Sequence, residues 1–332
     1  MTAAAIEPSD FVARFPWLGP DLQTLRNFIV RPRPDFSRWP GRRVELPLDD
    51  GSGDRLLGVL HDNPEEAKPL VVLVHGLTGC QDSFYVLRSA LQFLEQGYPV
   101  LRLNLRGAGP GRALAGRGYH AGSSADLAAG LRALAAQDGR ALAQGLMPVG
   151  YSLGGNILLK FLAEAGRDLP VRAAASVSAP IDLKAAQVRL MELRNRPYHA
   201  YLLSRMKAEL LAAPGGVSAG LAEAARRVRS VYDFDDEIVA PAGGFRGAED
   251  YYARCSAKRL LLDIEVPTLL LHAADDPWIP VEAYEAAAQL AKPNLQIVLP
   301  PGGGHVGFHG RGSETAWHDR MIGRFFSTQL DG

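Results

Sequence analysis

The segment that most constrains the fold of this 332-residue chain is a short glycine-rich run around one serine. The run Gly150-Tyr151-Ser152-Leu153-Gly154-Gly155 directly follows apolar residues 146–149 and directly precedes helical spacing over 156–162. A serine on so sharp a strand-to-helix turn needs a strained backbone, and side chains two positions before and after it would collide. Gly150 and Gly154 remove both collisions. The run therefore predicts a nucleophile elbow.

The helix after Ser152 suggests what the serine does. The unpaired N–H groups and positive dipole end of that helix point at the serine, which favours a negative charge forming there. The arrangement predicts acyl chemistry. The alternative is a glycine-rich turn that ends in a serine with no catalytic role. A histidine and an acid elsewhere in the chain that could activate the serine would argue against this alternative.

Strand-like and helix-like segments alternate along the chain. The continuous apolar run at residues 70–74 is typical of a strand buried on both faces of a parallel sheet. Further strands are predicted at 100–104, 171–177, 268–272 and 295–299, with an antiparallel pair at 44–48 and 56–60 before them, and helices at 84–95, 124–134 and 314–326. This alternation predicts an α/β fold with a mostly parallel, right-handed sheet. Together with the elbow, it indicates the α/β-hydrolase fold.

The alternation is interrupted between residues 181 and 260. This region has no convincing buried strand, and Tyr198, Leu202, Met206 and Leu210 recur at helical spacing. We therefore expect residues 1–41 to form an N-terminal arm packed as irregular chain, residues 42–180 and 261–332 to form the core, and residues 181–260 to form a helical cap insertion.

Composition excludes several other functional classes. Lys plus Arg equals Asp plus Glu at 36 each, so no charge surplus would attract nucleic acid or an anionic membrane. Cys80 and Cys255 predict two free thiols rather than a disulfide framework or a zinc cluster. The N-terminal residues lack the pattern of a signal peptide, and no apolar run reaches membrane-spanning length. We expect a cytoplasmic protein without metal, cofactor or integral membrane segment.

A serine nucleophile needs a base, and His305 is the predicted one. A hydroxyl is a poor nucleophile at neutral pH, so an imidazole must remove its proton and a third group must orient that imidazole. His305 lies among glycines just after the last predicted strand, where a loop can bring it over Ser152. His309 and His318 lack that glycine setting, and His272 is predicted as a strand-end core residue. The alternative for His305 is a solvated loop histidine.

Two adjacent aspartates, Asp275 and Asp276, compete for the acid. Both follow the penultimate predicted strand, from which a carboxylate can reach the histidine, and this fold runs Ser, then acid, then His along the chain. The spacing of Asp276 to Ile279 and Pro280 favours Asp276, with Asp275 as a turn former. The alternative is that Asp276 only starts the helix that follows it.

The oxyanion of the reaction needs two backbone N–H donors. Leu153, directly after the serine, provides the first. The second is predicted from the loop after the first central parallel strand, His75-Gly76-Leu77-Thr78-Gly79, where we choose the Leu77 amide. His75 itself is predicted to be structural, and simple turn chemistry is the alternative for His75-Gly76.

Several runs carry a more specific resemblance. They are residues 22–24, 75–79, 104–107, 119–122, the elbow and 303–308, joined by 232–236, 251–252 and 275–277. In these runs the chain resembles an α/β-hydrolase family of bacterial predicted hydrolases, fungal medium-chain ethyl-ester synthase/esterases and mammalian α/β-hydrolase-domain acylglycerol lipases. The resemblance implies a triad of Ser152, Asp276 and His305. Pro20-Asp21 stands where relatives often have Gly-His, and we expect no counterpart of the membrane anchor of the mammalian relatives.

These predictions converge on a serine hydrolase of small-molecule carboxylic esters that works through an acyl-enzyme. We expect short- to medium-chain acyl groups, with the apolar stripe from Tyr198 to Leu211 lining or covering the acyl pocket; ordinary packing of the insertion on the core is the alternative. Deacylation by an alcohol would instead give an acyltransferase. A non-catalytic ligand-binding protein on this fold, and a carbon-carbon bond hydrolase or peptidase, are the rival classes.

Overall fold

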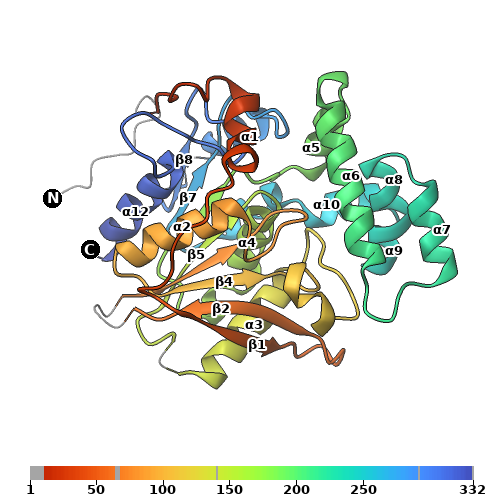
Figure 1. Cartoon of the computed structure of the whole chain (residues 1–332), viewed down its shortest axis with the longest axis horizontal. Helices are drawn as coiled ribbons and strands as arrows, with labels where there is room; N and C mark the ends of the chain where they lie inside the picture. Colours follow the sequence, from red (N-terminus) through yellow and green to blue (C-terminus); the bar gives the residue numbers. More distant parts are fainter. Residues whose placement is uncertain (1–10, 64–67, 140, 291, 331–332) are drawn as a thin grey trace.

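The strands build one mostly parallel sheet. The computed structural model describes residues 11–63, 68–139, 141–290 and 292–330, so the first ten residues of the predicted arm lie outside it. In the described residues the sheet has eight strands in the order β1-β2-β4-β3-β5-β6-β7-β8 (Figure 1). Their bounds are β1 (Gly41–Pro47), β2 (Arg55–His61), β3 (Leu70–Val74), β4 (Val100–Asn104), β5 (Leu146–Tyr151), β6 (Ala174–Val177), β7 (Thr268–Leu271) and β8 (Leu295–Val298). Only β1 with β2 and β2 with β4 pair antiparallel, which confirms the predicted fold class.

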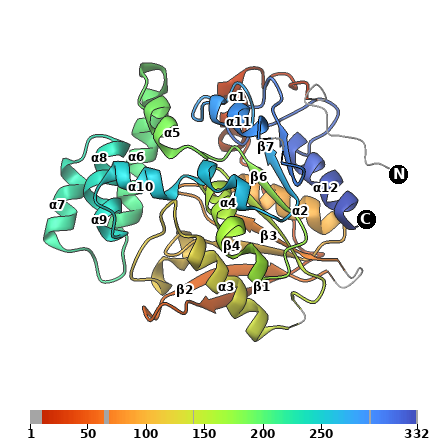
Figure 2. The ribbon, with the colours of Figure 1, turned by 180° about the vertical axis from the view of Figure 1, so that it is seen from behind.

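Helices cover both faces of this sheet. Helices α2 (Phe84–Glu95) and α12 (Trp317–Leu330) pack on one face, and α3 (Ser124–Gln137), α4 (Leu153–Ala165) and α11 (Glu282–Ala288) pack on the other. Figure 1 shows the face with α2 and Figure 2 the face with α3. Along β3, Val71 and Leu73 pack on the face covered by α2 and α12. Leu70, Val72 and Val74 pack on the face covered by α3, α4 and α11. Side chains of a strand alternate between faces, so burial on both sides explains the uninterrupted apolar run.

All regular structure in residues 181–260 is helical, and the structure describes every residue of this range. It comprises α5 (Leu183–Leu190), α6 (Arg196–Leu211), α7 (Ala219–Arg227), α8 (Val231–Phe234), α9 (Ala240–Ala242), α10 (Ala248–Cys255) and a π-helical turn at Asp235–Val239. Leu202, Leu203 and Val228 belong to a small core of this region, whereas Tyr252 and Cys255 join the main core. Figure 1 shows α6 to α9 beside the sheet. No helix within the described ranges is long and apolar enough to cross a membrane.

The arm contains a helix that the sequence pattern did not predict. Helix α1 spans Pro20–Val30, and its buried residues are polar, namely Gln23, Thr24, Arg26 and Asn27. Its apolar residues Phe28 and Ile29 are exposed. This inverts the usual amphipathic pattern, so hydrophobic periodicity conceals the helix.

Several element boundaries differ from the prediction by a few residues, and two of these shifts have a visible cause. Strand β6 begins at Ala174 rather than at residue 171, because Ala174 is the first residue paired with β7, and Val171 makes only an isolated bridge to Leu146. Helix α12 begins at Trp317 rather than at residue 314, because Glu314 lies outside the helix and binds Arg14 and Arg26.

Candidate active site

The serine lies on a strained turn between β5 and α4. Ser152 has φ 50° and ψ −124°, a backbone conformation that L-residues rarely adopt. A Cβ at Gly150 would lie 2.5 Å from the Gly154 carbonyl oxygen, and a Cβ at Gly154 would lie 2.3 Å from the His75 carbonyl oxygen. Both glycines are therefore required by contacts with backbone, which cannot move aside.

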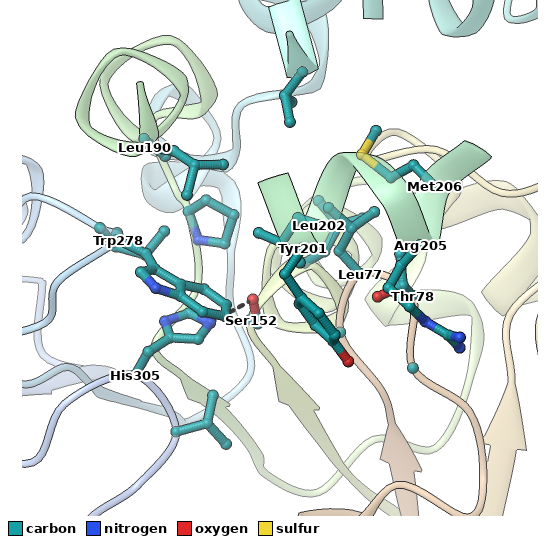
Figure 3. Close-up of a pocket in the computed structure, with 18 of the residues that line it drawn as sticks. Leu77, Thr78, Ser152, Leu190, Tyr201, Leu202, Arg205, Met206, Trp278 and His305 are labelled. Carbon is teal, nitrogen blue, oxygen red and sulfur yellow. Dashed lines mark hydrogen bonds between the residues drawn. The ribbon is translucent and has the colours of Figure 1, made fainter. Parts of the chain in front are cut away.

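Three side chains from distant parts of the sequence form one hydrogen-bonded chain. His305 Nε2 lies 2.9 Å from Ser152 Oγ (Figure 3), and His305 Nδ1 lies 2.8 Å from Asp276 Oδ2. The structure thus brings together the three side chains nominated from the sequence. With Asp276 ionised, the Nδ1–H donates to the carboxylate, and Nε2 is left to accept the serine proton.

The environment of Asp276 keeps its carboxyl group charged. Burial by itself would raise its pKa, but the neighbouring His305 charge and hydrogen bond, together with other contacts, hold the pKa below the usual value. The second oxygen, Oδ1, accepts the N–H groups of Trp278 at 2.8 Å and Ile279 at 3.0 Å. The buried carboxylate is therefore hydrogen-bonded on both oxygens.

The competing aspartate has a different contact. Asp275 Oδ1 accepts the backbone N–H of Gly304 at 2.9 Å. It therefore fastens the loop that carries His305, rather than contacting the imidazole. Burial raises the pKa of Asp275 above the usual value.

Helix α1 holds the same loop from its other side. Thr24 Oγ1 accepts the backbone N–H of His305 at 2.9 Å and donates to the Pro20 carbonyl at 2.7 Å. Gln23 Oε1 accepts the N–H of His309, and its amide group donates to the His309 carbonyl. The run Leu22-Gln23-Thr24 was noted only as part of the family resemblance, and its contact with the histidine loop could not be inferred from it.

Close packing between α1 and the loop explains two loop glycines. A Cβ at Gly304 would lie 2.4 Å from the Pro20 carbonyl oxygen, and a Cβ at Gly307 would lie 2.5 Å from the Gln23 carbonyl oxygen. The imidazole itself stacks on Trp278, with ring centroids 4.3 Å apart. The position of His305 is thus fixed through its backbone and its ring.

The two amides proposed for the oxyanion face the same cavity as Ser152. In the part of the chain that the structure describes, neither the Leu77 nor the Leu153 N–H donates to a protein acceptor. The next N–H in the loop, that of Thr78, donates to the Tyr119 hydroxyl at 2.7 Å. A Cβ at Gly76 would lie 2.9 Å from Ser152 Cβ. Tyr119 therefore fixes the loop, and Gly76 allows it to approach the serine.

Several other histidines are buried and form no part of this hydrogen-bonded chain, although His272 Nδ1 lies 3.9 Å from Asp276 Oδ2. His75 is buried, its Nε2 accepts the Leu105 N–H at 3.1 Å, and burial lowers its pKa to about 4. His272 stacks on Tyr284 at 4.2 Å, and burial lowers its pKa to about 4 as well. Burial also lowers the pKa of His309, to about 2. These side chains are kept neutral at ordinary pH by desolvation.

A cavity of about 360 Å³ opens onto Ser152 and His305. Helix α6 contributes four side chains to its lining, Tyr201, Leu202, Arg205 and Met206, and Figure 3 shows them opposite Trp278 and His305. Leu203 does not line this cavity and packs only in the small core of the helical region. Among the described residues, no group of three or more His, Cys, Asp or Glu side chains could hold a metal ion, and Cys80 and Cys255 are free thiols.

Comparison with known proteins gives matches over most of the chain. The model of the alpha/beta hydrolase fold family matches residues 69–311. The YheT protein of Escherichia coli (strain K12), named as a candidate esterase, is 37% identical over 87% of this chain and 84% of its own. A mouse protein named phospholipase ABHD3 is 28% identical over 73% of this chain, which spans only 58% of the mouse protein. A solved esterase of Pyrococcus furiosus, Pf2001, is 17% identical with a TM-score of 0.60, over 90% of this chain and 96% of that one.

Proposed function

The chain belongs to the α/β-hydrolase fold family, and we propose that it is a serine hydrolase that cleaves carboxylic esters through an acyl-enzyme. Ser152 is the proposed nucleophile, His305 the general base and acid, and Asp276 the residue that orients His305. The amides of Leu77 and Leu153 are the proposed oxyanion donors. The names of the Escherichia coli and mouse relatives, an esterase and a phospholipase, support ester cleavage as the reaction class.

The observation that carries this proposal is the hydrogen-bonded chain from Ser152 through His305 to Asp276. Its two contacts, 2.9 and 2.8 Å, are within the range of good hydrogen bonds. The chain ends at Ser152, which lines a cavity together with Leu77 and Leu153, whose N–H groups have no protein partner within the described residues. This combination of nucleophile, base, orienting acid and free donors is what acyl transfer requires.

In the first half of the reaction, Ser152 Oγ attacks the ester carbonyl carbon while His305 Nε2 takes the hydroxyl proton. The carbonyl oxygen becomes an oxyanion that accepts hydrogen bonds from the Leu77 and Leu153 amides. The intermediate then collapses: the bond to the alcohol oxygen breaks, His305 returns the proton to that oxygen, and the acyl group stays on Ser152.

In the second half, water replaces the alcohol. His305 removes a proton from the water as it attacks the acyl-enzyme, and then returns the proton to Ser152 Oγ as the acid leaves. Throughout, the carboxylate of Asp276 stabilises the imidazolium and holds the ring in one tautomer.

The volume and the apolar lining of the cavity support short- to medium-chain acyl groups. A volume of about 360 Å³ is near the lower end of the range for small-molecule sites, about 300 to 1,000 Å³. Leu190, Leu202 and Met206 line it with apolar side chains. Increasing chain length in a series of p-nitrophenyl esters should first raise and then lower kcat/KM, and Met206→Trp should move the maximum to a shorter chain.

Fluorophosphonate labelling tests the proposed nucleophile. The wild-type protein should be labelled and Ser152→Ala should not, with both variants folded by circular dichroism. Labelling of Ser152→Ala at the wild-type rate would refute the assignment. Parallel assays with amide and ketone substrates separate ester cleavage from the peptidase and carbon-carbon bond hydrolase alternatives.

A further inference from the structure

Asp235 places a buried carboxyl group between two cavities. It begins the π-helical turn Asp235–Val239, and such turns are frequent at functional sites. It lines the 360 Å³ cavity that contains Ser152 and also a neighbouring cavity of about 860 Å³. Leu77 and Leu153, the proposed oxyanion residues, line both cavities as well. Asp235 thus lines the same cavity as the proposed nucleophile, Ser152.

One oxygen of this carboxyl group is without a partner. Oδ2 accepts the hydroxyl of Tyr252 at 2.7 Å. Within the described ranges, Oδ1 accepts no hydrogen bond and no Lys, Arg or His side chain forms an ion pair with Asp235. The side chain is 8% exposed, and burial raises its pKa to about 7. Oδ1 is not among the fully buried side-chain atoms that lack a partner, so it keeps some accessible surface and is available to a ligand in the cavity.

The larger cavity is the more polar of the two near Asp235. Arg112, His120 and Glu209 line it beside apolar residues, whereas mostly apolar side chains of α5 and α6, together with Gln187 and Arg205, line the smaller one. Burial raises the pKa of Glu209 to about 7, so this acid is only partly ionised at neutral pH. The apolar cavity suits an acyl chain, and the larger cavity suits a polar alcohol group.

A hydroxyl group satisfies Oδ1 better than other ligands do. A hydroxyl can donate to the ionised carboxylate and accept from the protonated acid, so it is hydrogen-bonded in both states. A cation binds well only to the ionised form of the carboxyl group. A ligand group that can only accept hydrogen bonds binds well only to the protonated form.

We propose that Asp235, held by Tyr252, recognises a hydroxyl group on the alcohol part of the ester. The preferred substrates are then esters of hydroxylated alcohols rather than simple alkyl esters. This inference rests on the proposed function, because it assigns the specificity of the same site.

Two matched esters test the proposal. The assay measures kcat/KM for 2-hydroxyethyl butyrate and for ethyl butyrate by titration of the released acid. The wild-type protein should prefer the hydroxylated ester by about fivefold, the value of one neutral hydrogen bond. Asp235→Leu should bring this ratio close to one. Asp235→Asn should keep most of it, because the amide can still hydrogen-bond a hydroxyl.

Two further variants control for structural damage. Asp235→Leu leaves the Tyr252 hydroxyl unpaired, so the double variant with Tyr252→Phe removes both groups and should also give a ratio close to one. Glu237→Leu changes an exposed acid on the same turn that lines neither cavity, and it should keep the wild-type ratio.

The outcomes separate this inference from the proposed function. If the wild-type protein cleaves neither ester, the proposed function fails. If it cleaves both with equal kcat/KM, or if the folded double variant keeps the preference, only the role of Asp235 is refuted. A preference for butyrylcholine, or for ethyl 3-hydroxybutyrate, that Asp235→Leu removes would replace alcohol-hydroxyl recognition by recognition of a cation or of the acyl part.

Discussion

The contact between α1 and the histidine loop gives the sharpest prediction. Thr24→Val keeps the shape of the side chain but removes the oxygen that accepts the His305 N–H at 2.9 Å. Thr24 and His305 are each 6% exposed, so water cannot readily replace this oxygen. The His305 N–H is then left unpaired, which costs about 1 to 3 kcal/mol unless the loop moves.

If the loop moves so that the His305 N–H finds another acceptor, the imidazole is displaced from Ser152. A displacement of about 1 Å at a catalytic group can lower the rate about 100-fold. We therefore expect kcat/KM of Thr24→Val to fall between about 10-fold and 100-fold, with a melting temperature lower by a few degrees.

Ester hydrolysis and thermal unfolding, measured on the same preparations, check this prediction. Thr24→Ser is the matched control, because it keeps the hydroxyl and should retain most of the activity. If Thr24→Val hydrolyses esters as well as Thr24→Ser does, α1 has no part in positioning His305, and the reasoning is wrong.

Three further predictions follow from the site and the core. Asp276→Asn should lower kcat about 10,000-fold, because a neutral amide no longer selects the required tautomer of His305. Asp275→Asn should lower kcat far less. Similar losses of kcat in both variants would contradict the assignment. Tyr119→Phe should lower kcat about tenfold with little change in melting temperature, by removing the hydroxyl that fixes the oxyanion loop; unchanged kcat would show that the loop holds its shape without it. The pKa of His75 and His272 is about 4 in the folded protein and near 6.5 in an unfolded chain, so below pH 6.5 the unfolded chain binds more protons. The free energy of unfolding should therefore be unaffected by these groups above pH 6.5 and fall by about 2 kcal/mol per histidine at pH 5, which urea titrations at pH 7 and pH 5 would detect.

Much of the fold was predictable because its signals are local. The uninterrupted apolar run of β3 and the helical spacing of α2 follow from side-chain period alone, and the bounds of both match the prediction. Around Ser152, Gly150 and Gly154 are each demanded by a backbone contact within the turn or with the adjacent strand, so the elbow too was visible in a short stretch of sequence. The order of serine, aspartate and histidine along the chain then nominated the other two side chains.

The sequence by itself could not reveal the role of α1 or of Asp235. In α1, Gln23 and Thr24 are buried because they pair with backbone groups of the histidine loop, which lie about 280 positions away in the chain. The contrast between Asp275 and Asp276 has the same origin, since adjacent residues with identical side chains differ only in which partner the fold brings to them.

Periodicity and glycine placement thus determined the sheet, its layers and the position of the serine. The tertiary structure alone decided which polar groups meet across the molecule and where a carboxyl group is left facing a cavity. The physical reason is that burial of apolar side chains depends on local pattern, whereas the partner of a buried polar group is set by the packing of segments distant in the chain.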